Sequence, residues 1–72
     1  RQRDSVIEHR LRLLTQRERE VMQLVVAGKL NKQVADELNI SMKTVEAHRA
    51  RVMEKMGART LAELVKAVMS VN

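Results

Sequence analysis

Apolar residues recur at the spacing of a helix along most of this chain. In one segment they are Val21, Met22, Leu24, Val25 and Val26. This spacing places them on one side of a helix. Thr15, followed three residues later by Glu18, has the pattern of an N-terminal capping box. Gly28 can end the helix because glycine takes the left-handed conformation at little cost. The pattern predicts a helix over about 16–27.

A shorter helix is predicted from Asn31, a good N-cap residue, to Asn39, which can provide a left-handed stop. Its apolar positions are Val34, Ala35 and Leu38. Ser41 is then the N-cap of a longer helix over about 42–56 that stops at Gly57. Because only three or four residues separate these two helices, they must cross steeply, which is the helix-turn-helix arrangement.

Both ends of the chain carry further helical patterns. Thr60 and Glu63 have the spacing of a second capping box. The helix that follows them carries on one side Leu61, Leu64, Val65 and Val68. Near the N-terminus, the residues at helical spacing are Ile7, Leu11 and Leu14. A short helix is therefore predicted within residues 1–13.

Composition supports an all-α fold in one small domain of 72 residues. Proline is absent and there are only two glycines, which favours helices over a turn-rich sheet. Without cysteine, disulfides and thiolate metal sites are excluded. There is neither a membrane-spanning apolar run nor a signal-peptide pattern, so a cytoplasmic setting is expected. Because the first residue is Arg1 rather than methionine, we expect a fragment of a longer protein.

Positive charge is concentrated in two parts of the chain. The formal net charge is +5, of which residues 41–59 carry +3 and residues 1–20 carry +2. A basic excess on one element is the expected footprint of a phosphate-binding surface. Many solvated helices are equally basic, so charge alone does not decide whether the partner is a nucleic acid.

Successive residues of a helix turn by about 100°, which separates two faces of the helix over 42–56. The residues that face the core are Val45, Val52 and Met56. The residues on the opposite side are Lys43, Ala47, Ala50 and Glu54, with Glu46 and Arg51 at its two edges. This outward face is small at its centre and charged at its edges, which suits a helix that must lie deep in a groove about 12 Å wide.

Four residues of this face are predicted to contact bases. Ala47 and Ala50 allow a close approach, and their methyl groups can lie against thymine methyls. Glu46 can accept a hydrogen bond from cytosine N4, and Arg51 can reach guanine or a phosphate. The alternative is that both alanines are simply helix formers on a solvated face. Glu46 would then pair along the helix with Arg49 or Lys43.

The predicted phosphate contacts are Asn31, Lys32, Lys43, Thr44, His48 and Lys55. Lys43 and Thr44 lie in a first helical turn, where free backbone N–H groups and the helix dipole favour an anion. The same reason applies to Asn31 and Lys32. For His48, a hydrogen-bonded structural role is the alternative.

Arg49 lies close to the core-facing arc, so its stem is expected to pack while its guanidinium reaches the edge. An ion pair with Glu18 or Glu20 is the hypothesis for its charged group.

The order and spacing of several motifs carry a resemblance to a known family. Residues 14–56 read "LTQREREVMQLVVAGKLNKQVADELNISMKTVEAHRARVMEKM". This stretch resembles the LuxR-type helix-turn-helix, the DNA-binding domain of LuxR, NarL and FixJ. The resemblance covers roughly residues 14–67, and "HRARVMEKMGARTLAELV" is most similar to the FixJ branch of response regulators.

The resemblance implies a four-helix domain over residues 14–72 whose third helix enters the major groove of double-stranded DNA. Positions matching Glu46, Ala47 and Ala50 are where relatives contact bases, although many relatives carry lysine at the position of Glu46. It also implies a homodimer formed partly through Leu61, Leu64, Val65 and Val68. Residues 1–13 would be the interdomain linker after an N-terminal receiver domain that is absent here. RNA polymerase is a further candidate partner, and no cofactor or metal is implied.

Three other functions are alternatives. An enzyme is disfavoured, because the two histidines are 39 positions apart and there is neither a Gly-rich phosphate loop nor a metal-ligand cluster. Region 4 of a sigma factor has a similar helix-turn-helix and shares the text "REREV", but "TVEAH" and the last helix favour the LuxR type. A helical protein-interaction module with a basic face is the third alternative. The sequence thus predicts the DNA-binding output domain of a two-component transcription regulator.

Overall fold

The computed structural model describes residues 5–71, and within that range it contains helices and no strands. Its helices are α1 (Ser5–Arg12), α2 (Gln16–Val26), α3 (Asn31–Leu38), α4 (Met42–Met56) and α5 (Leu61–Met69). The predicted all-α class is confirmed, and α1 is the short helix predicted near the N-terminus. No helix of the described part of the chain has the length and apolar character required to cross a membrane.

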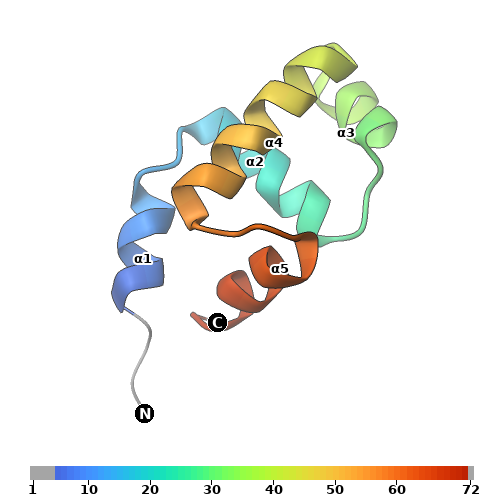
Figure 1. Cartoon of the computed structure of the whole chain (residues 1–72). Coiled ribbons are helices and arrows are strands. Elements are labelled where there is room, and N and C mark those ends of the chain that lie inside the picture. Colours follow the sequence, from blue (N-terminus) through green and yellow to red (C-terminus); the bar gives the residue numbers. More distant parts are fainter. Residues whose placement is uncertain (1–4, 72) are drawn as a thin grey trace.

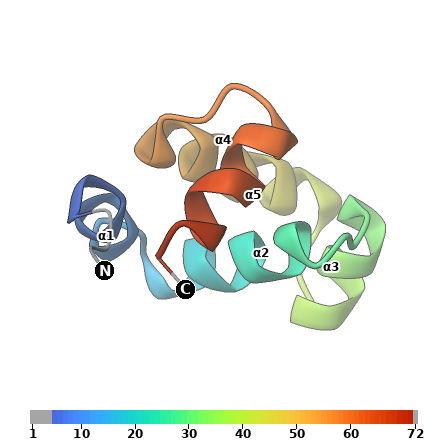
Figure 2. The same cartoon turned by 90° about the horizontal axis from the view of Figure 1, so that it is seen from below.

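The helices α2 and α4 form the centre of the molecule. Figures 1 and 2 show α1 at one end of this pair and α3 at the other, with α5 packed across the middle. The domain is correspondingly elongated, with extents of 39 × 20 × 19 Å. Because α1, α2, α3 and α5 all contact α4, the position of α4 depends on every other helix.

Most of the predicted helix boundaries are confirmed by their capping geometry. Thr15 Oγ1 accepts from the N–H of Glu18 at 3.1 Å, and Glu18 Oε1 accepts from the N–H of Thr15 at 3.0 Å, which completes the capping box. Ser41 Oγ accepts from the N–H of Thr44 at 3.0 Å and caps α4. Asn39 ends α3 with φ 57°, in the left-handed region that was predicted for it.

Two capping predictions need correction. Leu30, not Asn31, is the N-cap of α3, and the N–H of Leu30 donates to Gln33 Oε1 at 2.8 Å. Thr60 caps α5 as predicted, by accepting from the N–H of Glu63 at 3.1 Å. The reciprocal bond differs, because Glu63 Oε1 accepts from the N–H of Arg59 at 2.7 Å instead of from Thr60. In both cases a longer side chain reaches a backbone N–H that precedes the helix.

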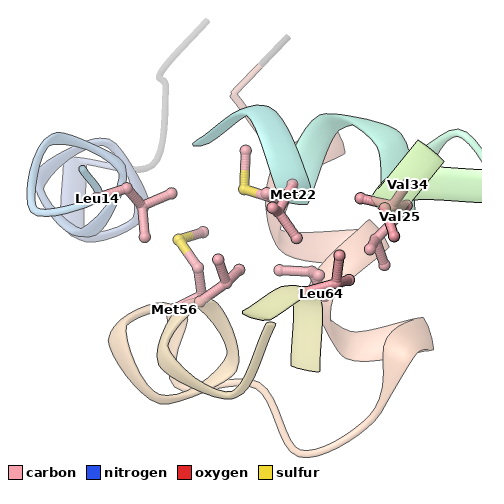
Figure 3. Close-up of a cluster of buried hydrophobic side chains, with 10 residues drawn as sticks. Leu14, Met22, Val25, Val34, Met56 and Leu64 are labelled. Carbon is pink, nitrogen blue, oxygen red and sulfur yellow. The ribbon is translucent and has the colours of Figure 1, made fainter. Parts of the chain in front are cut away.

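The core consists of aliphatic and methionine side chains from α2, α3, α4 and α5, together with Leu14 from the segment between α1 and α2 (Figure 3). Its most deeply buried members, each at most 1% exposed, are Val21, Val34, Val45, Val52, Met56 and Leu64. Every predicted core residue of α4 is in this group. Removing a buried side chain of this kind typically costs about 2–5 kcal/mol, so the apolar stripe of α4 holds the domain together.

Polar contacts fasten α1 and the segment after it to the rest of the domain. Arg10 Nη1 donates to the carbonyl oxygen of Met56 at 3.1 Å, at the C-terminus of α4. In the opposite direction, Arg19 Nη2 donates to the carbonyl oxygen of Leu11 at 3.0 Å, near the C-terminus of α1. Cations favour helix C-termini because the carbonyl groups there lack helical partners. Residues 5–12 of the predicted linker segment therefore form a helix that packs against α4, whereas residues 1–4 lie outside the described part of the chain.

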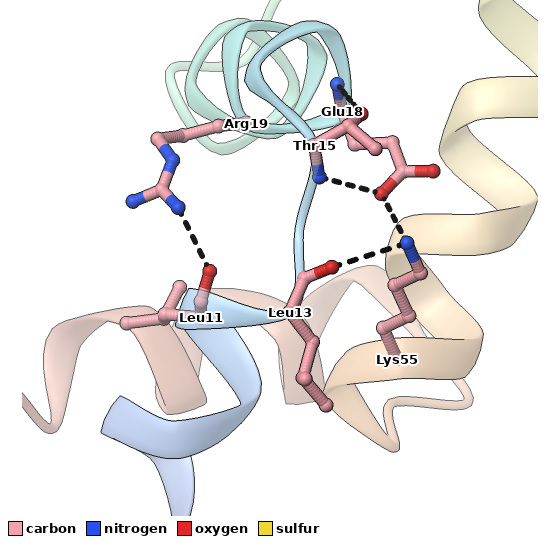
Figure 4. A network of polar contacts seen from close by, with 6 residues as sticks. All are labelled: Leu11, Leu13, Thr15, Glu18, Arg19 and Lys55. Carbon is pink, nitrogen blue, oxygen red and sulfur yellow. Dashed lines mark hydrogen bonds and ion pairs between the residues drawn. The ribbon is translucent and has the colours of Figure 1, made fainter.

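Glu18 is a buried carboxylate, 1% exposed, at the junction of α1, α2 and α4 (Figure 4). Lys55 Nζ lies 2.7 Å from Glu18 Oε1 and donates to the carbonyl oxygen of Leu13 at 3.2 Å. Burial, the largest influence on the pKa of Glu18, raises it. The hydrogen bonds from Lys55 and Thr15 and the charges of Lys55 and Arg51 together outweigh burial, so the pKa lies below its usual value.

Glu18 should make the stability of the domain pH-dependent. Because the pKa is lower in the folded state, the stabilisation is fully present above the unfolded pKa of about 4.3 and is lost as the pH falls through the folded pKa. Glu18→Gln keeps the acceptor for Thr15 but removes the charge beside Lys55. We expect this variant to lose about 1–3 kcal/mol of unfolding free energy at pH 7, and the difference from the parent protein to shrink as the pH falls below about 4.

Urea unfolding followed by circular dichroism at several pH values would measure this difference. Glu37→Gln, at an exposed position of α3, is the matched control and should change stability by less than about 0.5 kcal/mol. A Glu18→Gln deficit that stayed constant down to pH 3 would show that the ion pair does not stabilise the fold.

Candidate nucleic-acid interface

The helices α3 and α4 are joined by residues 39–41 and pack against each other. The N–H of Ile40 donates to the carbonyl oxygen of Ala35 at 3.0 Å, which closes the end of α3. Ile40 itself packs against the hydrophobic core. So short a turn with a packed apolar side chain fixes the start of α4 relative to the end of α3, and this is the predicted helix-turn-helix.

The two faces of α4 are divided as the 100° periodicity predicts. Val45, Val52 and Met56 are at most 1% exposed and form the inner face. The residues predicted to face outwards are all exposed, and they are Lys43, Glu46, Ala47, Ala50, Arg51 and Glu54. We call this set the outer face of α4. Small side chains at its centre leave the helix backbone open to close approach.

Glu46 forms no hydrogen bond or ion pair with any described residue. The alternative pairing with Arg49 or Lys43 is therefore not observed. An exposed carboxylate that has no partner in the domain remains free to accept a hydrogen bond from another molecule. Its position at the edge of the outer face, beside Ala47 and Ala50, fits the predicted contact with a cytosine amino group.

The first turn of α4 presents one cation and one fixed hydroxyl. Lys43 is exposed, whereas Thr44 is half-buried with its Oγ1 2.8 Å from Ser41 Oγ. The side chain of Ser41 accepts from the N–H of Thr44 and so fixes the helix start, while the other N–H groups of the first turn have no partner within the helix. A rigid, electropositive helix start next to Lys43 is suited to an anion such as a phosphate.

At the start of α3, the side chain of Asn31 is already bound. Its Oδ1 accepts a hydrogen bond from Arg49 Nη1 at 3.0 Å, and the neighbouring Lys32 is exposed. The hypothesis of an ion pair between Arg49 and Glu18 or Glu20 is wrong, since Glu18 binds Lys55. Glu20 instead binds two residues of α2, Gln16 and Arg17.

Lys55 and His48 are seven residues apart and therefore lie on the same flank of α4. The Lys55 ammonium is engaged by Glu18 and by the carbonyl of Leu13, so we do not propose it as a phosphate ligand. His48 is half-buried, and within residues 5–71 its Nδ1 is buried and has no hydrogen-bond partner. The alternative of a hydrogen-bonded structural histidine is thus not supported at this nitrogen.

The four apolar residues of α5 that were predicted at a dimer interface differ in exposure. Leu61 is 42% exposed, while Val65 and Val68 are half-buried. Leu64 is 0% exposed and belongs to the core, which removes it from any surface available to a second copy. The prediction failed for Leu64 because the apolar stripe of α5 contains both core residues and residues at the border of the core, and helical spacing does not separate them.

The contacts that sequence reasoning missed all join distant residues. The bond between Arg49 and Asn31 spans 18 positions, and the pair of Lys55 and Glu18 spans 37. Arg49 and Asn31 also line a groove of about 340 Å³ with Val25, Gly28, Lys29, Leu30 and Leu61. No local spacing rule links these positions. No cluster of potential metal ligands occurs in the described residues.

A helix-turn-helix whose second helix offers an exposed face open to close approach is typical of DNA-binding domains of transcription regulators. The family of bacterial regulatory proteins named luxR matches residues 12–68 of this chain. The chain therefore belongs to the luxR family, and its domain is a LuxR-type helix-turn-helix of response-regulator output domains. This family is a class of transcription regulators and not a class of enzymes.

Two curated relatives illustrate the similarity. The tetrathionate response regulatory protein TtrR of Salmonella typhimurium strain LT2 is 55% identical over 53 residues, which are 74% of this chain and 26% of the relative. The transcriptional regulatory protein FixJ of Rhizobium meliloti strain 1021 is 53% identical over 60 residues, which are 83% of this chain and 29% of the relative. The chain thus spans less than a third of these relatives.

Solved structures agree with this fold. The solution structure of the C-terminal transcriptional activator domain of FixJ from Sinorhizobium meliloti matches with a TM-score of 0.79 and 48% identity, covering 92% of this chain and 84% of that one. The response regulator StyR matches with a TM-score of 0.86 and 44% identity, covering 88% of this chain and 32% of that one.

Proposed function

We propose that this domain binds double-stranded DNA in a sequence-specific manner by placing the outer face of α4 in the major groove. The observation that carries the proposal is the exposed pair of alanines at the centre of that face, between the carboxylate of Glu46, unpaired within residues 5–71, and the exposed guanidinium of Arg51. A helix that only needed a solvated charged surface would have no need for an open centre. Close approach to base edges does need one.

Phosphate contacts would hold the domain on the duplex. Lys43 and the rigid first turn of α4 supply one contact, and Lys32 with the start of α3 supplies a second. Thr44 in the same first turn, and His48 one helical turn further along α4, can add contacts to the phosphate backbone through their polar atoms. Such contacts set the register of α4 without reading sequence.

Base contacts would come from Glu46, Ala47, Ala50 and Arg51. Glu46 would accept from cytosine N4 and Arg51 would donate to guanine, while the alanine methyl groups would pack against thymine methyls. Because Glu46 and Arg51 lie on opposite edges of the outer face, they would read separate base pairs.

The whole protein would be a bacterial response regulator of the two-component type, acting in the cytoplasm. An N-terminal receiver domain phosphorylated on aspartate would precede α1, and residues 1–13 would be the linker between the domains. Two copies would associate partly through Leu61, Val65 and Val68 of α5 and would bind half-sites about one helical turn apart. RNA polymerase is the candidate partner in transcription.

Selection of binding sites from random duplex DNA tests this function. We expect enrichment of one motif, with paired half-sites separated by about 10 base pairs. Enrichment of a single half-site would argue against dimerisation of this fragment. If no sequence is enriched and the domain does not bind duplex DNA, the proposed function is wrong.

Lys43→Ala should weaken binding to every sequence by a similar factor, because a phosphate contact carries no sequence information. The slope of log K against log salt should also become less negative by about one. Fluorescence anisotropy with selected and scrambled duplexes at several salt concentrations would measure both effects. Lys66→Ala on α5 is the control and should leave the slope unchanged. A change in sequence preference alone would show that Lys43 reads bases.

Glu46→Ala should relax preference at a single base pair by about 1–3 kcal/mol, because the acceptor for one base edge is lost. Site selection with the variant would reveal the affected position. Glu54→Ala removes the same charge from the same helix and is the matched control. Glu54→Ala should strengthen binding to all sequences without altering sequence preference. If Glu46→Ala selects the same motif as the parent protein, the assigned contact of Glu46 is wrong.

A further inference from the structure

Arg49 is a half-buried cation on α4 that points away from the outer face. At about 100° per residue it lies next to the arc of Val45, Val52 and Met56. Its stem lines the groove beside Val25, Leu30 and Leu61, and its guanidinium reaches Asn31. An arginine in this place packs its carbon chain against apolar walls and uses its charged end for one directed contact.

That contact has a particular place in the helix-turn-helix. Residues 39–41 join the end of α3 to the start of α4, while Asn31 lies at the opposite end of α3. Within residues 5–71, the bond from Arg49 to Asn31 is the one side-chain hydrogen bond that links α3 to α4. The remaining contact between the two helices is apolar packing, which is non-directional. The turn therefore holds one end of α3, and Arg49 holds the other.

Arg49 makes no ion pair within the described part of the domain, so its charge is not explained by stabilisation of the fold. No carboxylate among the described residues pairs with it, and its partner is the neutral amide of Asn31. Replacing Arg49 would leave no carboxylate buried and unpaired, which is the usual cause of a large loss when one partner of an ion pair is removed. An aliphatic side chain of similar length can cover the same groove wall.

We propose that Arg49 is a positioning residue for DNA binding, which acts by holding Asn31 and thereby the first turn of α3 at a set position relative to α4. This inference rests on the proposed function. The phosphate contact at the start of α3 and the base contacts on α4 must form together, so their relative position determines affinity. Arg49 itself does not touch DNA, and it affects binding to all sequences alike because it changes no base contact.

A double-mutant cycle tests this role. Arg49→Met, Asn31→Ala and the double variant are compared with the parent protein on the duplex obtained by site selection, with fluorescence anisotropy as the readout. Arg49→Met should weaken binding about tenfold, which is the loss of roughly 1.4 kcal/mol. In the Asn31→Ala background, Arg49→Met should weaken binding less than about twofold, because the hydrogen bond between Arg49 and Asn31 is already absent.

Two controls separate positioning from the alternatives. Arg59→Met removes a positive charge outside the contact of α3 with α4 and should change affinity less than about twofold. Thermal unfolding of each variant shows whether it is folded. If Arg49→Met is not folded, Arg49→Gln, which keeps an N–H donor, replaces it in the double-mutant cycle, and the same affinities are measured.

The outcomes are distinct. An equal loss from Arg49→Met with and without Asn31 would mean that Arg49 contacts phosphate directly, and it would overturn the proposal. Unchanged affinity in folded Arg49→Met would also overturn it, and so would a changed motif in site selection. If the parent protein binds no duplex, the proposed function fails first. Binding by the parent protein combined with independent effects of the two substitutions contradicts only the role of Arg49.

Discussion

Burial of one stripe of α4 is the constraint on which the rest of the structure depends. Val45, Val52 and Met56 are almost fully enclosed, and contacts from the other four helices converge on this one. An α-helix has only one direction opposite a buried stripe, so burial on this side leaves Ala47 and Ala50 on the free side. The surface that we propose to meet DNA therefore follows from which residues of the same helix are buried in the core.

Five cations of α1 and α4 fall into two groups with different physical roles. Lys55, Arg10 and Arg49 turn inwards and bind a carboxylate, a carbonyl and an amide that belong to other helices. Lys43 and Arg51 remain exposed on the outer face and have no such partner in the described residues. A count of basic residues in this region overstates the charge available to a phosphate backbone, because half-buried cations are already committed to holding helices together.

Sequence reasoning was most successful where the deciding interactions are local. The capping box of Thr15 and Glu18, the cap at Ser41 and the left-handed stop at Asn39 all act over three or four residues, and all were predicted. It failed at Asn31, because Gln33 caps the preceding N–H, and at Leu64, because the amphipathic pattern of α5 does not separate core from edge. The motifs of the luxR family were recognisable because their order and spacing are kept along the chain.

By itself, then, the sequence determined the helices, most of their ends and the inward and outward faces of α4, since caps and the 3.6-residue period depend on neighbours in the chain. Only the tertiary structure decided where Lys55 and Arg49 direct their charges. Their partners are 37 and 18 positions away. The packing of α2 and α3 against α4 determines which acceptor a long flexible side chain reaches. Helical periodicity in the sequence does not predict that packing.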